Sequence, residues 1–162
     1  MNRLNPKKTI IVGTILVVGI ILLLSINYRL LPSSKDTYPN YLKEITGKSI
    51  NLTSSYQDEV ALWNSHFYSN TTMAKITETY IPKFVSQLNQ FNTTEAPTKY
   101  SKVKENYLKS FANEIKSYEL FDKFLRTKNS TANKLSNDYL SAALNYETKA
   151  RTAFDDANNS SR

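Results

Sequence analysis

The sequence predicts an all-α protein in which a single N-terminal transmembrane helix leads into an antiparallel four-helix bundle. Three observations support this. Residues 9–26 form an uncharged run in which 13 of 18 residues are hydrophobic. Beyond this run the chain has one glycine, Gly47, whereas tight β-hairpins usually need glycine at positive φ. The apolar residues that follow recur every three or four positions, which is typical of amphipathic helices.

The apolar run is long enough to cross a bilayer, because 18 helical residues cover roughly 27 Å. We expect a cytoplasmic basic N-terminus at 1–8 and a signal-anchor helix at 9–31. A cleaved signal peptide is the competing interpretation, but its apolar region is usually about 7 to 15 residues long. No A-x-A-like cleavage site follows the run. The sequence therefore favours an uncleaved anchor that contacts the lipid bilayer through residues 9–31.

The charges around this segment predict its orientation. Arg3, Lys7 and Lys8 precede the span, and positive residues tend to stay in the cytoplasm. We therefore expect a single-pass cell-membrane protein with a cytoplasmic N-terminus and an extracytoplasmic C-terminal domain. A pilin-like filament subunit, cut after Lys8, is an alternative, although many such subunits carry a glutamate where Thr14 stands.

The remaining chain divides into a juxtamembrane linker at 32–38, a helical bundle at 39–157 and a disordered tail at 158–162. Gly47 to Ser49 could break the first helix, and Pro82 should kink the second because proline lacks the backbone donor. Residues 69–72 suit a turn and helix cap, and Pro97 suits the first turn of the third helix. The expected inward-facing residues are Leu42, Ile45, Leu52, Tyr56, Val60, Trp63 and Phe67 in the first helix; Met73, Ile76, Tyr80, Phe84, Leu88 and Phe91 in the second; Tyr100, Val103, Tyr107, Phe111, Ile115, Tyr118, Phe121 and Leu125 in the third; and Leu135, Tyr139, Ala142, Tyr146, Ala150, Ala153 and Ala157 in the fourth.

Residues suited to catalysis or metal binding are scarce in this sequence. The chain has no cysteine and one histidine, His66, without the Glu-x-x-His motifs of di-iron bundles. We interpret His66 as a helix-face residue and the pairs Asp58-Glu59 and Asp155-Asp156 as solvated helix ends. The sequence thus predicts no catalytic residue, no cofactor and no metal. A hydrolase remains an alternative, less favoured than an interaction module or a sensor ectodomain.

The most regular charged feature is a row of lysines in the third expected helix. Lys102, Lys109, Lys116 and Lys123 are seven residues apart and should lie on one side of that helix. Such a row could bind an anionic glycan, the lipid surface or an acidic partner. The favoured interpretation is a solvated helix face, because Glu105, Glu119 and Asp122 each stand four residues before a basic residue. Nucleic acid is not an expected partner, since no known reading module is present.

Asparagine sequons occur throughout the expected outer region. Their excess over chance is slight, but most fall in expected turns, so glycosylation is sterically allowed. The candidate glycosylation sites are Asn51, Asn70, Asn92, Asn129 and Asn159.

Together these features predict a non-enzymatic, membrane-anchored interaction or accessory module of the cell envelope. Its expected partner is a membrane or envelope protein, bound in part through the lysine row, and a homo-oligomer is compatible with the sequence. The chief alternative is a small-ligand sensor ectodomain that signals through a partner, since membrane-tethered four-helix bundles resemble chemoreceptor ectodomains.

Overall fold

A computed structural model describes residues 37–159, and this part of the chain is entirely helical. It contains four long helices, one 3₁₀ turn and, within 37–159, no strand. The predicted all-α class is confirmed. The expected transmembrane segment, 9–31, lies outside the described residues, and no helix within them has the length and hydrophobicity to cross a membrane. The elements are α2 (Thr37–Asn64), α3 (Asn70–Thr93), η2 (Thr98–Tyr100), α4 (Ser101–Thr127) and α5 (Ser130–Asn159).

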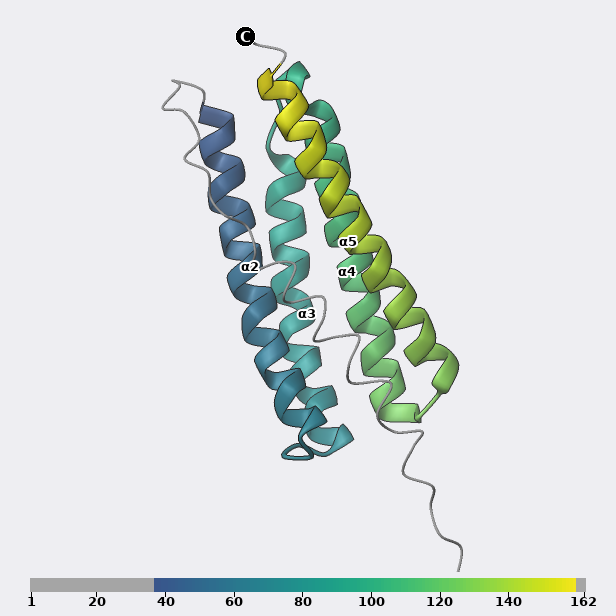
Figure 1. The fold of residues 1–162 in the computed structure, drawn as a ribbon. Coiled ribbons are helices and arrows are strands. Elements are labelled where there is room, and N and C mark those ends of the chain that lie inside the picture. Colours follow the sequence, from purple (N-terminus) through teal and green to yellow (C-terminus); the bar gives the residue numbers. More distant parts are fainter. Residues whose placement is uncertain (1–36, 160–162) are drawn as a thin grey trace, which may run out of the picture.

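The four helices run up and down beside one another (Figure 1). Each helix packs on its neighbour in the chain, and the contact between α4 and α5 is the most extensive. The start of α2, η2 and the end of α5 lie at one end of the molecule, whereas the α2–α3 and α4–α5 turns lie at the other.

The interior is rich in aromatic rings and is divided into two clusters. Tyr56, Phe84 and Tyr118 form the centre of the first, with centroid distances of 4.6 Å for Tyr56–Tyr118 and 4.8 Å for Phe84–Tyr118. Such aromatic pairs contribute about 0.5–1.5 kcal/mol beyond the area they bury. The second cluster lies nearer the start of α2 and includes Phe91 and Tyr100. Aromatic packing thus runs along the whole bundle.

Two expected irregularities do not interrupt the helices. Helix α2 continues through Gly47, with buried Ile45 and Ser49 on either side. Beyond this point the Ser55 hydroxyl donates to the Asn51 carbonyl within the same continuous helix. Helix α3 likewise includes Pro82, which is exposed. Because Pro82 lacks a backbone N–H, α3 has one helical hydrogen bond fewer at this position.

The residues expected to face inward are buried or half-buried in α3 and α4, whereas some of those expected in α2 and α5 are exposed. Phe67 is 75 % exposed, because α2 ends at Asn64 and Phe67 lies in the following turn. Leu135 and Tyr139 are 41 % and 37 % exposed. Ala150 of α5 is buried as expected, and this helix also buries three small residues outside the expected stripe, which are Ala132, Ser136 and Ala143.

The helix ends show which expected caps form. Ser69 caps α3 as expected, since its hydroxyl accepts a hydrogen bond from the Thr72 backbone at 3.1 Å. Asn129 caps α5 by accepting from the backbone of Thr131 at 2.9 Å. Pro97 differs slightly from expectation, because it precedes η2 and lies outside α4. Side chains thus satisfy one free N–H group at the start of α3 and two at the start of α5.

Candidate functional site

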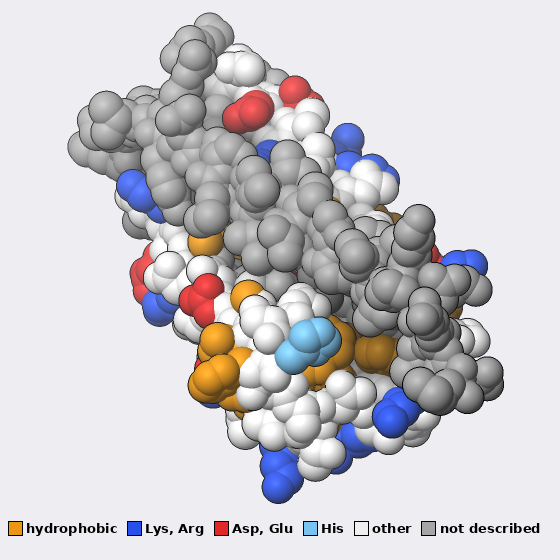
Figure 2. All heavy atoms as spheres, turned by 60° about the horizontal axis from the view of Figure 1, so that its bottom comes forward, with side chains coloured by type: hydrophobic (Ala, Val, Ile, Leu, Met, Phe, Trp, Pro, Cys, Tyr) orange, Lys and Arg blue, Asp and Glu red, His pale blue; other side chains and the backbone are white. Residues whose placement is uncertain are grey.

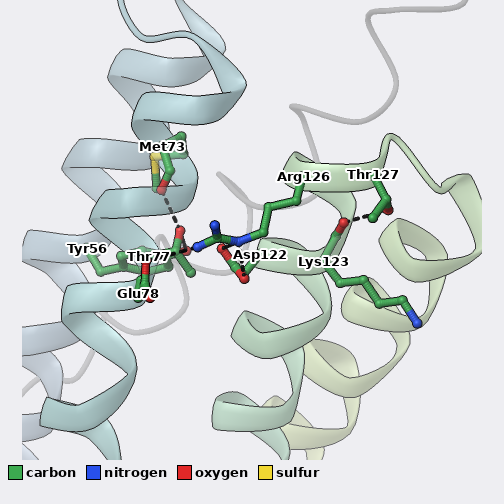
Figure 3. A network of polar contacts seen from close by, with 8 residues as sticks. All are labelled: Tyr56, Met73, Thr77, Glu78, Asp122, Lys123, Arg126 and Thr127. Atoms are coloured by element: carbon green, nitrogen blue, oxygen red, sulfur yellow. Dashed lines mark hydrogen bonds and ion pairs between the residues drawn. The ribbon is translucent and has the colours of Figure 1, made fainter.

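The four lysines of the predicted row all lie on α4, and all are exposed. A seven-residue spacing separates neighbouring lysines by roughly 10.5 Å along a helix. Figure 3 shows that Lys123 points away from the ion pairs between α3 and α4. The row therefore lies on a side of α4 that its contact with α3 leaves uncovered.

Two lysines of the row form ion pairs within α4. Lys109 Nζ lies 2.6 Å from a carboxylate oxygen of Glu105, and Lys116 Nζ lies 2.9 Å from one of Glu119. The expected Glu105–Lys109 pair is thus confirmed, whereas Glu119 pairs with Lys116 and not with Lys123. Such exposed pairs contribute little to stability. They orient the ammonium groups without removing them from solvent.

The row also borders aromatic residues of α5. The Lys109 ammonium lies 5.6 Å from the ring centroid of Tyr146, and Lys149 of α5 lies 5.0 Å from the same ring. The hydrogen bond to Glu119 raises the pKa of Lys116, and Tyr139 of α5 adds a smaller effect in the same direction. Lys109 therefore faces a tyrosine of the neighbouring helix.

Small polar residues bring α4 and α5 into this arrangement. The Ser110 hydroxyl donates to the Ala143 carbonyl at 2.9 Å, and the Ser136 hydroxyl donates to the Ser117 carbonyl at 2.8 Å. The Ser117 and Ser136 hydroxyls also lie 3.1 Å apart. These bonds reach from one helix to the backbone of the other, which requires a close approach of the two helices. This seam places the lysine row beside α5.

A separate ion-pair network joins α3 to α4 (Figure 3). Arg126 Nε lies 2.8 and 2.9 Å from the two carboxylate oxygens of Asp122, which confirms the expected Asp122–Arg126 pair. The same guanidinium reaches Glu78 of α3 at 3.0 Å. Beneath it the hydroxyls of Tyr56 and Thr77 are hydrogen-bonded at 2.9 Å, and Thr77 also donates to the Met73 carbonyl. These contacts hold α2, α3 and α4 together.

One shielded carboxyl group was not anticipated from the sequence. Glu114 of α4 accepts hydrogen bonds at one oxygen from the Thr53 hydroxyl, at 2.8 Å, and from the Tyr118 hydroxyl, at 2.7 Å. Burial raises the pKa of the Glu114 carboxyl, and the two donors lower it by less. The only signal in the sequence is the position of Glu114 between Phe111 and Tyr118 on the apolar stripe.

The other candidate residues are scattered. His66 lies exposed in the α2–α3 turn, with φ of 63°, and not on a helix face. Figure 2 shows the histidine at this end, beside hydrophobic side chains. Asp58 and Glu59 lie in the second half of α2 and not near its start, while Asp155 and Asp156 lie exposed near the end of α5. Residues 37–159 contain no group of three or more acidic, His or Cys side chains that could hold a metal.

The sequon asparagines have different surroundings. Asn51 is exposed on α2, and Asn92 is exposed near the end of α3. Asn70 is half-buried, and its side-chain oxygen accepts a hydrogen bond from the Trp63 indole at 2.9 Å. Asn129 caps α5, and Asn159 is the last residue of that helix. Three of these asparagines are open to solvent, and their side chains take part in none of the contacts described above: Asn51, Asn92 and Asn159.

Comparison with known proteins adds no assignment, since no protein-family model, curated protein or solved structure matches the chain.

The raised pKa of Glu114 predicts a pH-dependent stability. A carboxyl group with a folded-state pKa above its unfolded value stabilises the protein below the unfolded pKa, and this contribution is lost as pH rises through the folded pKa. The free energy of unfolding of the wild-type chain should therefore fall relative to that of Glu114→Gln as pH rises from 4.5, the ordinary value for this group. Urea unfolding at a series of pH values measures this difference. Parallel curves for the two proteins would contradict the prediction.

Proposed function

We propose that the chain is a non-enzymatic protein, anchored in the cell membrane by residues 9–31, whose extracytoplasmic helical bundle acts as an interaction or accessory module of the cell envelope. The N-terminal support is the uncharged apolar run and the basic residues Arg3, Lys7 and Lys8 before it. The bundle follows directly, because α2 begins at Thr37. A membrane or envelope protein is the proposed partner.

The observation that carries the interaction role is the exposed lysine row beside the tyrosines of α5. The Lys109 ammonium lies beside Tyr146 of α5, and Lys123 points away from the α3–α4 network. A protein surface that combines exposed cations with aromatic rings is suited to binding an acidic partner. The row is therefore more than a set of internal ion pairs, since Lys109 and Lys116 remain exposed while they are paired.

The fold also indicates how an anchored bundle would present this surface. The start of α2, where the chain would leave the membrane, lies at the same end as the start of α4 (Figure 1). Helix α4 has 27 residues, and it therefore extends roughly 40 Å from that end. Lys102 would lie nearest the bilayer and Lys123 farthest from it. A partner would thus meet the row along the length of the bundle.

The proposed topology can be tested because the sequence lacks cysteine. A single cysteine at Lys75→Cys, an exposed position on α3, should react with a membrane-impermeant maleimide in intact cells. A cysteine at Asn2→Cys should react only after the membrane is permeabilised. Gel-shift labelling of the two variants measures both. The reverse pattern would contradict the proposed orientation.

The proposed interaction role can be tested by cross-linking intact cells and purifying the full chain through a C-terminal tag. We expect a membrane or envelope protein to be recovered with it in stoichiometric amount, identified by mass spectrometry. Recovery of the chain alone would contradict the interaction role. Thermal stabilisation by a small molecule, with no protein recovered, would instead favour the sensor function.

A further inference from the structure

Helix α5 carries an exposed stripe in addition to the residues that it buries against α4. Leu135, Tyr139, Ala142 and Tyr146 are spaced by four, three and four residues. Leu135 and Tyr139 are 41 % and 37 % exposed, and Ala142 and Tyr146 are half-buried. Alternating three- and four-residue spacing is the pattern by which a helix packs along another helix. The two core clusters of residues 37–159 include none of these four residues, so the exposed part of the stripe can contact a helix of another protein.

The stripe and the lysine row lie side by side and in register. The Lys109 ammonium lies 5.6 Å from the ring centroid of Tyr146, and the Ser110–Ala143 and Ser117–Ser136 hydrogen bonds carry the same register along the helices toward Lys116 and Tyr139. The two helices are antiparallel, so a step of seven residues toward the end of α4 corresponds to a step of seven residues toward the start of α5. The two features singled out separately in the sequence therefore form one surface, which we call the α4–α5 face. It comprises Leu135, Tyr139, Ala142 and Tyr146 with Lys102, Lys109, Lys116 and Lys123.

The charge around this face is predominantly positive. Lys134 and Lys149 of α5 stand next to the stripe in the helix, which gives six lysines with the row. The acidic residues in comparable positions are Glu105, Glu119 and Asp138, and the first two are already paired with Lys109 and Lys116. A partner with the opposite charge would therefore be attracted to the face and oriented on it.

We propose that the α4–α5 face binds an acidic amphipathic helix of the partner protein, an inference that rests on the proposed function. Apolar residues of that helix, three and four positions apart, would pack on the stripe. Asp or Glu residues repeated every seven positions would meet the lysines, because the spacing along both helices is roughly 10.5 Å. This helix-on-face arrangement is a common mode of recognition.

The charge of the face and the direction of α4 favour an acidic helix over two other occupants, a second copy of the chain and a lipid surface. A second copy would bring the same basic face against itself in a symmetric dimer, which places like charges together. A lipid surface would meet only one end of the row, because α4 extends away from the end at which α2 begins. An acidic helix alone matches both the charge and the length of the face.

Site-specific photo-cross-linking of the full chain in intact cells tests this proposal. A photoreactive phenylalanine analogue replaces Tyr139 on the face or, as the matched control, Val85, which is 36 % exposed on α3. We expect position 139, and not position 85, to give an adduct. Mass spectrometry should show that the attached peptide is rich in Asp and Glu and has apolar residues three to four positions apart.

Several outcomes would overturn the proposal. These are an adduct with the chain itself, with lipid or with a peptide poor in acidic residues, and an equal adduct yield at both positions. If tag purification recovers a partner while position 139 gives no adduct, the face is wrong but the interaction role stands. If neither measurement finds a partner, both proposals fail.

A charge-reversal pair gives a second, independent readout. The double variant Lys109→Glu, Lys116→Glu should lower the adduct yield at position 139 by about tenfold, because two attractive contacts become repulsive. The control Lys75→Glu, Lys83→Glu changes the net charge equally on α3 and should leave the yield within about twofold. A neutral pair, Lys109→Gln with Lys116→Gln, should give an intermediate loss and guards against a folding defect. Equal losses in the face and control variants would overturn the proposal.

Discussion

The close contact between α4 and α5 is the constraint on which the surface of this protein depends. Ser110 and Ser136 each donate a hydrogen bond to the backbone of the opposite helix, and Ala143 and Ala150 offer little bulk between them. Such small side chains allow two helices to approach closely. With the narrow side of α5 turned toward α4, its larger residues Leu135 and Tyr139 remain at the surface. The lysine row and the tyrosines consequently meet along one face.

The other helices are held by a different kind of packing. Tyr56, Phe84 and Tyr118 join α2, α3 and α4 through their rings, and the tyrosine hydroxyls find polar partners inside. Tyr118 donates to Glu114, and Tyr56 is hydrogen-bonded to Thr77. A buried polar group without a partner is costly, so these bonds are needed for the tyrosines to serve as core residues. The interior therefore depends on matched hydroxyl and carboxyl groups as well as on apolar area.

The sequence predicts most of this fold because periodicity and capping are local signals. The inward residues of α3 and α4 follow the expected three- and four-residue spacing, and Ser69 caps α3 as its position suggests. The prediction fails in part for α5, where two stripes run along the helix about a quarter turn apart. The stripe with Leu135 and Tyr139 is the more hydrophobic, so the sequence predicts that it is the buried one. In the structure the stripe with Ser136 and Ala143 is buried, because α4 lies close to that side of α5. That selection depends on the neighbouring helix, which a single sequence does not show.

The candidate site is predictable to a similar degree. The lysine row follows from seven-residue spacing alone, but its alignment with Tyr139 and Tyr146 depends on the α4–α5 register. The sequence signal for Glu114 is weak, because a carboxylate on an apolar stripe usually indicates a solvated edge. Its hydrogen-bond donor Thr53 is 61 residues away in the chain. Long-range pairings of this kind are set by tertiary packing and not by local pattern.

The account depends most directly on the tightness of the α4–α5 seam, which two neighbouring substitutions can measure. Ala143 is 4 % exposed at the seam, whereas Ala142 is half-buried on the outer stripe. Ala143→Leu should lower the free energy of unfolding by about 1–3 kcal/mol, because the added carbons cannot fit between the helices. Ala142→Leu should change it by less than about 0.5 kcal/mol. Urea unfolding of the full chain in detergent measures both, and an Ala143→Leu variant as stable as the wild type would contradict the close seam.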